Sequence, residues 1–221
     1  MSYILYEDGN ILHLTDSCSL IRVTMRNDEL IIPEGVISTS QNLEIEGEVK
    51  RIIFPTSMER IAAFSFRENR QLLEVSFPKN SRLLSIGYQA FYRAAHLRSI
   101  QLPGRSLRMI DEEAFEQSGL QKISIQSDSL YIGRLAFQAA QLEEVKLNAK
   151  KLTISDAAFR RCLKLKSLEV SADELTVGRF AFASCRDVQE FDVEARQIAQ
   201  IDDSAFWCTP AYDEIRKAKG G

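Results

Sequence analysis

Four cysteines and two histidines are the residues of this chain best suited to metal binding or nucleophilic chemistry. A metal site needs paired ligands at short spacings such as C-x-x-C, and these residues are too far apart in the sequence to supply them. They are Cys18, Cys162, Cys185 and Cys208, with His13 and His96. We therefore expect no metal and no cofactor, and we interpret the cysteines as reduced thiols that pack as small apolar groups.

Sequence motifs of catalysis are also missing. The chain has no G-x-S-x-G elbow and no glycine-rich phosphate loop, and His96 occupies a variable polar position of the repeat described below. Carboxylates gather at 111–113 and Glu116, where they begin a predicted helical turn whose dipole favours negative charge. We predict that the chain has no catalytic residues and is not an enzyme.

Arginine and tyrosine form the strongest candidate for a binding surface. Residues 60–110 hold eight Arg and one Lys against Glu68 and Glu74, and Arg and Tyr are enriched among the residues that dominate protein interfaces. One alternative is a set of solvated charges spread around the molecule. Another alternative is a binding site for nucleic acid or a different polyanion, but the net charge of −3 disfavours such a site. The predicted partner-binding residues, facing an acidic protein surface, are Arg67, Arg70, Tyr88, Tyr92, Arg93, Arg98, Arg105 and Arg108.

These side chains must be positioned by a repeat that runs through most of the chain. A phenylalanine returns every 22–25 residues, with a small residue just before it and an Ile or Val five residues before it. Apolar residues then follow as L-x-x-I-x-L, and the period of two indicates a short strand with one buried face. The repeated phenylalanines are Phe66, Phe91, Phe115, Phe137, Phe159, Phe182 and Phe206.

Each repeat predicts a strand and one or two turns of helix. A residue able to cap a helix, such as Gly87 or Asp111, comes directly after the Ile or Val and is followed by a segment such as YQAFYRA. The Ala-Phe pair should point inward. Because one unit cannot bury its apolar face alone, the units must stack into a solenoid. The predicted fold is an α/β repeat solenoid with short parallel strands.

The outward positions of the strands form two columns that become acidic toward the C-terminus. The columns end in Glu144, Ser167 and Glu190 and in Lys146, Glu169 and Asp192.

The pattern I-G-x-x-A-F-x-x-C/small-x-x-L-x-x-I-x-L/V-P resembles the BspA-type leucine-rich repeats of bacterial and protist surface proteins. The resemblance covers about residues 52–208, after a degenerate coil in residues 30–55. The solenoid favours a non-enzymatic module that presents a broad face to a protein partner, and the alternative that the resemblance implies is a surface adhesin. Prolines follow the early strands at Pro33, Pro55, Pro78 and Pro103, whereas the later repeats carry Asn148, Ser171 and Glu194 there.

Both ends are expected to cap one single-domain solenoid. Residues 1–29 predict a β-rich cap with a hairpin around Asp8 to Asn10, and residues 30–208 the leucine-rich repeat solenoid. Residues 209–221 predict a short C-terminal capping helix and a flexible tail. With no secretion signal and no apolar run of membrane-spanning length, the sequence predicts a cytoplasmic protein. A cell-surface location is the alternative if a leader was removed.

Overall fold

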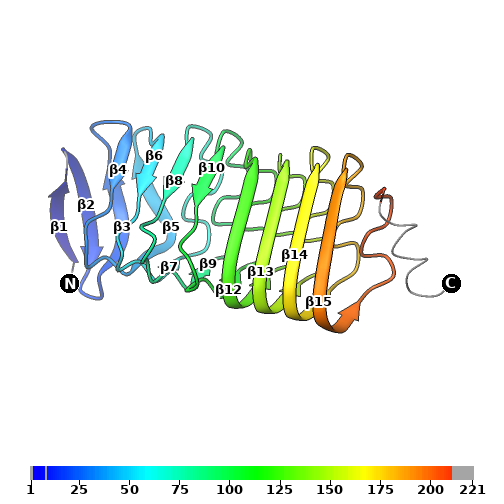
Figure 1. Cartoon of the computed structure of the whole chain (residues 1–221). Helices are drawn as coiled ribbons and strands as arrows, with labels where there is room; N and C mark the ends of the chain where they lie inside the picture. The colour runs from blue at the N-terminus through cyan, green and yellow to red at the C-terminus, as the bar shows by residue number, and fades with distance from the viewer. Residues whose placement is uncertain (1, 8, 211–221) are drawn as a thin grey trace.

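The chain winds into a solenoid of about eight turns, in which parallel strands from successive turns lie side by side (Figure 1). The structure is a computed structural model and describes residues 2–7 and 9–210. Within these residues it contains strands and turns but no helix. The predicted solenoid is confirmed, but the prediction that it is of the α/β type is wrong.

The strands of the described residues form two sheets. The larger sheet has the order β1-β2-β3-β5-β7-β9-β11-β12-β13-β14-β15, and the smaller has the order β10-β8-β6-β4. All neighbours are parallel except in β1-β2-β3, where they are antiparallel. The bounds are β1 Ser2–Glu7, β2 Asn10–Thr15, β3 Ser19–Thr24, β4 Glu29–Ile31, β5 Ser38–Glu46, β6 Arg51–Ile53, β7 Arg60–Ile61, β8 Glu74–Ser76, β9 Ser85–Ile86, β10 Ser99–Gln101, β11 Met109–Ile110, β12 Lys122–Ile132, β13 Glu144–Ile154, β14 Ser167–Val177 and β15 Glu190–Ile201.

The two halves of the solenoid differ in how the chain turns the corner between the two strands of a coil. In the early coils a loop that contains Pro78 or Pro103 separates two short strands, because proline cannot donate to a ladder of hydrogen bonds. In the later coils Asn148 and Ser171 occupy that position, and the strand continues through the corner as one element of 11 residues. In Figure 1 the short strands β4, β6, β8 and β10 lie in a row along the top of the view, which ends beside the upper half of β12.

The core is a column of stacked phenylalanine rings that runs along the solenoid. Neighbouring rings from Phe66 to Phe206 lie 4.9–5.3 Å apart between centroids and are nearly parallel. Every ring of the column is buried, as are the six alanines and Ser65 that precede the rings. The prediction that the Ala-Phe pair points inward is confirmed.

The segments predicted as helical turns are instead turns whose alternate N–H groups point along the stack. Phe137 N donates to the Ala158 carbonyl of the next coil over 2.7 Å, whereas Gln138 N donates back to the Leu135 carbonyl over 3.0 Å. Leu135 and Ala139 have positive φ angles of 59° and 54°. The residues two before and two after each ring repeat this left-handed conformation in six consecutive coils, which no α-helix can contain.

Glycine after the Ile or Val has a different role from the predicted helix cap. A Cβ atom added to Gly133 would lie 2.6 Å from the Glu112 backbone nitrogen, closer than real atoms approach. The glycine is thus explained by the close approach of two coils.

The described residues include only part of each predicted cap. β1 pairs antiparallel with β2, and Asp8 of the expected hairpin turn lies outside the described residues. The predicted C-terminal helix and tail also lie outside them, except for Thr209 and Pro210, where no helix begins. The boundaries at residues 29/30 and 208/209 stay predictions.

Candidate binding surface

The turns of two successive coils bring aromatic rings and arginines together into one surface. We define the Arg–Tyr patch as Phe64, Arg67, Tyr88, Tyr92 and Arg93. The Arg67 guanidinium carbon lies 5.4 Å from the Tyr92 ring centroid and 5.7 Å from that of Phe64. The Arg93 guanidinium carbon lies 5.0 Å from the same Tyr92 ring centroid. Both arginines therefore share one aromatic ring in cation–π geometry.

Backbone hydrogen bonds between the coils hold the Arg–Tyr patch in place. Phe64 N donates to the Tyr88 carbonyl over 2.9 Å, and Glu68 N donates to the Tyr92 carbonyl over 2.7 Å. The Phe64 and Tyr88 rings meet edge to face at 5.1 Å. The backbone of the patch is thus fixed by the neighbouring coil rather than carried on a flexible loop, so little backbone conformational entropy should be lost when a partner binds.

The electrostatics of the Arg–Tyr patch are only partly compensated. Glu68 is the one carboxylate near both arginines, at 3.8 Å from Arg67 and 3.9 Å from Arg93, and all three side chains are about half exposed. Such long, solvated ion pairs are weak. The patch retains an excess of positive charge at its surface.

A polar network borders the patch on its C-terminal side. Gln89 Nε2 donates to the Tyr88 hydroxyl oxygen over 3.1 Å and also to the Glu113 carboxylate. Arg134 pairs in turn with Glu112 and Glu113. Burial raises the pKa of Tyr88 above its ordinary value, and the Glu113 and Glu112 carboxylates add to the shift. The Tyr88 phenol is therefore neutral at physiological pH.

The other predicted binding residues lie elsewhere on the coils. Arg70 and Arg98 stand in the segments that lead from the turns to β8 and β10, where the Arg70 carbonyl oxygen lies 2.6 Å from His96 Nδ1. Arg105 and Arg108 lie at the corner before β11, and Arg108 is 3.9 Å from Asp128 of β12. The structure brings four of the eight residues into one patch and separates the remaining four from it.

Half-buried and exposed aromatic residues on the turns were missed by the sequence analysis. Phe64 belongs to the Arg–Tyr patch, and Phe180 and Trp207 form a second pair with ring centroids 6.3 Å apart. Phe180 is 41% exposed and Trp207 48%. Phe64 and Phe180 share the position two residues before a core ring. An aromatic residue at that outward position is the signal that could have identified them.

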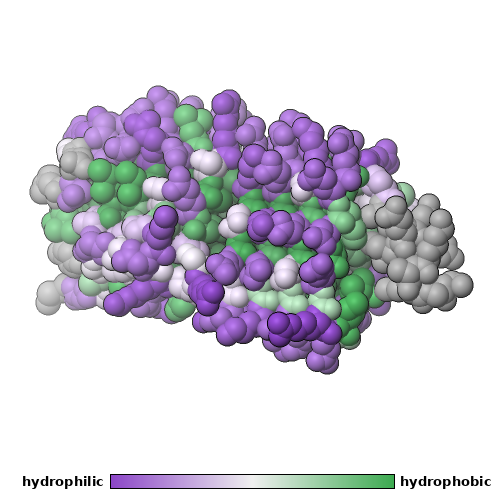
Figure 2. Space-filling model, in the orientation of Figure 1, coloured by the Kyte–Doolittle hydropathy of each residue, from purple (hydrophilic) through white to green (hydrophobic). Residues whose placement is uncertain are grey.

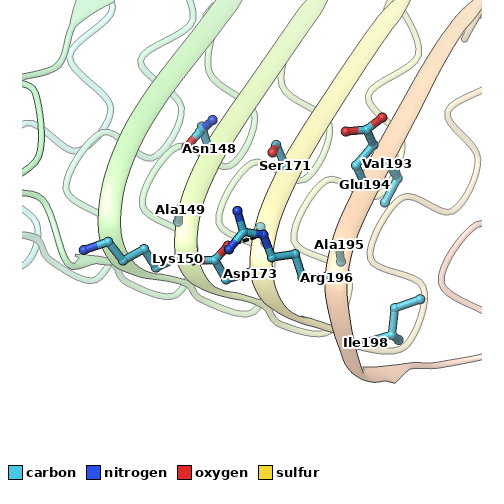
Figure 3. A pocket seen from close by; sticks show the side chains of 11 residues that line it. Asn148, Ala149, Lys150, Ser171, Asp173, Val193, Glu194, Ala195, Arg196 and Ile198 are labelled. Atoms are coloured by element: carbon cyan, nitrogen blue, oxygen red, sulfur yellow. Dashed lines mark ion pairs between the residues drawn. The ribbon is translucent and has the colours of Figure 1, made fainter.

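A groove also crosses the corners of β13, β14 and β15 and has a volume of about 740 Å³. Its floor is made by the small residues Ala149, Ala172 and Ala195, which pair in register. Figure 3 shows polar side chains on both sides, with an ion pair of 3.2 Å between Arg196 and Asp173. Figure 2 shows apolar groups between rows of hydrophilic side chains over these long strands.

The thiols are placed as packing groups. Cys162 Sγ donates to the Phe137 carbonyl and Cys185 Sγ to the Phe159 carbonyl, each over 3.2 Å, and both residues are fully buried. Burial raises the pKa of the Cys162 thiol well above its ordinary value, so it is not a thiolate. Among the described residues, no group of three or more His, Cys, Asp or Glu side chains could hold a metal ion.

The stacked coils, the inward Ala-Phe pairs and the single column of rings define a leucine-rich repeat solenoid. A family model described as the BspA type leucine rich repeat region matches residues 39–166 and 130–216, in six copies. These matches span well over half of the chain, and it belongs to this family. The resemblance inferred from the sequence is confirmed.

Solved structures of bacterial proteins share the fold. A leucine-rich repeat protein of T. pallidum has a TM-score of 0.65 and 20% identity, over 85% of this chain and 87% of that one. A leucine-rich repeat protein from Bacteroides ovatus has a TM-score of 0.62 and 23% identity, over 95% of this chain but 55% of that one. A leucine rich cell surface protein from Faecalibacterium prausnitzii has a TM-score of 0.51 and 15% identity, over 94% of this chain and 80% of that one. No curated protein matches the chain.

Proposed function

We propose that this chain is a non-enzymatic protein-binding module whose Arg–Tyr patch contacts an acidic surface on a partner protein. The observation that carries the proposal is the pair of arginines, Arg67 and Arg93, stacked on the Tyr92 ring at a rigid and partly exposed site. Arg and Tyr anchors of this kind contribute most of the binding energy at many interfaces.

The distribution of charge favours a protein partner over a polyanion. A protein that neutralises several phosphates needs a continuous basic track. Here Arg108 faces Asp128 at a corner, while Arg67 and Arg93 share Glu68 on the turns. The positive surface is therefore short, which suits one or two carboxylates better than a nucleic-acid backbone.

The test compares the wild-type chain with two double variants in a quantitative pull-down from lysate of the source cells. Arg67→Glu/Arg93→Glu reverses the charge of the patch. Arg160→Glu/Arg161→Glu is the matched control, because these two exposed arginines occupy the same two positions of a later coil. A partner that loses at least tenfold in recovery with the first variant alone supports the proposal. Equal recovery with all three proteins rejects it.

The salt dependence of binding separates the two classes of ligand. Binding to a protein through one or two ion pairs should weaken only modestly between 50 and 200 mM salt, whereas neutralising six or more phosphates would cost roughly a thousandfold or more. Nucleic acid in the eluate, with that steep salt dependence, would favour the polyanion alternative.

The cellular location is a separate part of the proposal. No helix among the described residues is long and apolar enough to cross a membrane. The cytoplasmic location and the surface adhesin lead to different results when intact cells are labelled with a membrane-impermeant biotin reagent. Labelling of this protein without labelling of cytosolic markers would support the adhesin alternative.

A further inference from the structure

β15 is the outermost strand of the larger sheet and is bonded on one side only. It pairs with β14, and no second strand of the described residues pairs with its other edge. Its apolar positions are correspondingly uncovered. Leu175 of β14 is fully buried, whereas Ile198, its partner in β15, is 59% exposed. Val193 is half-buried, although its partner Val170 is buried. Over residues 190–198 this strand thus presents an edge that pairs with no other strand of the described residues, together with part of its apolar face.

In the preceding strands, charged side chains form ion pairs with opposite charges on the adjacent strand. Lys146 Nζ on β13 lies 2.7 Å from the Glu169 carboxylate on β14, and Lys151 Nζ lies 3.1 Å from Glu174. At the approach to the same strands Lys166 pairs with Glu143 at 3.2 Å. Opposite charges in register between adjacent strands stabilise their pairing. Each interior strand therefore finds part of its compensating charge on the next one.

This compensation ends at β15. Its alternate residues Glu190, Asp192 and Glu194 are all acidic and exposed, and none forms an ion pair within the described residues. Asp192 even stands opposite Glu169, a residue of like charge. Between the three acids lie the half-buried apolar residues Phe191 and Val193. In the part of the chain that the structure describes, this edge has no covering strand, and its three carboxylates, spaced two residues apart, have no cation as an ion-pair partner.

We propose that the free edge of β15 binds an extended segment of a partner protein in which basic and apolar residues alternate. The main-chain groups of such a segment would continue the sheet. Its basic side chains would face Glu190, Asp192 and Glu194, and its apolar ones would cover Phe191 and Val193. This surface is distinct from the Arg–Tyr patch and selects the opposite charge.

A second copy of this chain does not meet these requirements. The N-terminal strand β1, with the sequence SYILYE, contains no Lys or Arg. If two β15 strands paired antiparallel about Ala195, Glu194 would face Arg196, but Asp192 and Glu190 would face the uncharged Ile198 and Gln200. One cation for three carboxylates is insufficient, so the charge pattern favours a different protein.

The test uses fluorescein-labelled peptides and fluorescence anisotropy with the full chain. The pattern peptide KLKVKAK keeps the apolar residues of β14 and places lysine at each outward position. Two control peptides are ELEVEAE, which reverses the charge, and KKLVAKK, which keeps the composition but loses the alternation. We expect the pattern peptide to bind at least about tenfold more tightly than either control, because three ion pairs and the alternate apolar contacts act together. Equal binding of KLKVKAK and KKLVAKK overturns the proposal, since only net charge would then matter.

Charge reversal on the protein locates the site. The variant Glu190→Lys/Asp192→Lys/Glu194→Lys should bind ELEVEAE more tightly than KLKVKAK, and it should still fold because a lysine at 192 faces Glu169 favourably. Unchanged preference in this variant overturns the proposal. The control triple Glu48→Lys/Glu59→Lys/Asp187→Lys has the same net charge without touching β15, and it should keep the wild-type preference.

One further variant tests whether the chain supplies its own basic segment. Residues 211–221 include Arg216, Lys217 and Lys219. If replacing all three by Gln makes KLKVKAK bind about tenfold more tightly, these residues compete for the edge and the proposal of an external partner is overturned. Unchanged binding supports it.

Discussion

Removal of one ring from the phenylalanine column should divide the solenoid energetically. Phe137 is fully buried and stacks between Phe115 and Phe159, with ring centroids 5.1 and 4.9 Å away. Phe137→Ala should cost about 3–5 kcal/mol in the free energy of unfolding through lost transfer energy and the cavity left behind. The cost should lie at the upper end, because two ring contacts worth about 0.5–1.5 kcal/mol each are lost as well.

The assay can follow the two halves of the molecule separately. Trp207 is the only tryptophan and reports on the C-terminal end, whereas far-UV circular dichroism reports on all coils. Because each coil contacts only its neighbours, a defect at Phe137 should separate the two urea transitions, which we expect to coincide in the wild-type protein. Leu163→Ala is the control: this leucine is 51% exposed and lies in a different coil from Trp207, so we expect a cost of only about 1 kcal/mol. A cost below about 1 kcal/mol for Phe137→Ala, with coincident transitions, would refute this account of the core.

Three more predictions follow from the turns, the thiols and the carboxylates. Ala139→Gly should be neutral or stabilising, because the φ of Ala139 is 54°. Ala140→Gly should lose about 1–2 kcal/mol, because Ala140 has an ordinary φ and its methyl group is buried; urea titration of both variants tests the left-handed positions. Cys162→Ala should cost no more than about 1–2 kcal/mol in the same titration, since Ala140 fills the equivalent position one coil earlier, and a larger loss would show a specific need for the thiol. Hydrogen bonds from the next coil lower the pKa of Glu34, and a nearby lysine lowers that of Asp128. The two carboxylates therefore stabilise the folded state fully above the ordinary carboxyl pKa. This contribution is lost as the pH falls through the lowered pKa values, below about 4. The urea midpoint should therefore drop on the acid side, and Glu34→Gln should reduce that drop; an equal drop in both proteins would contradict the role of Glu34.

The register of the repeat could be predicted from the sequence because apolar or small side chains occupy the buried positions in coil after coil. Phenylalanine preceded by a small residue recurs at a nearly constant interval, and every ring from Phe66 to Phe206 is in the core. The outward strand columns were also predictable, since a period of two assigns each residue to one face. Lys146, Glu169 and Asp192 do lie side by side in register.

The backbone of the turns could not be predicted in the same way. A helical turn and these stacked turns both place a small residue and a ring inward within one short segment, so the apolar pattern fits either. The difference is the left-handed conformation at positions such as Arg93 and Gln117, which glycine would have signalled but other residues do not. Hydrogen bonds to the next coil stabilise the strained positions, and such a partner is visible only once the coils are stacked.

The split of the arginines has a related cause. The sequence places Arg67, Arg93, Arg105 and Arg108 within two coils, but one coil of 24 or 25 residues has several sides. Arg93 is next to a turn, whereas Arg108 leads into a strand on a different side. Proximity along the chain therefore says little about proximity on the surface. Only the offset from the core ring decides which residues of different coils are neighbours, as it does for Arg67 and Tyr92, each directly after its ring.

The two proposed surfaces have one physical origin, namely places where the repeat stops being periodic. The backbone and the inward residues are nearly identical from coil to coil, so they carry little information that could select a partner. At the Arg–Tyr patch, two successive coils place aromatic and basic side chains in contact with one another, a combination that depends on both coils. At β15, the acidic residues continue the strand columns, but no further strand of the described residues compensates them. The first site is therefore basic and aromatic, and the second is an acidic strand edge without ion-pair partners among the described residues. The two sites should bind partners of opposite charge independently.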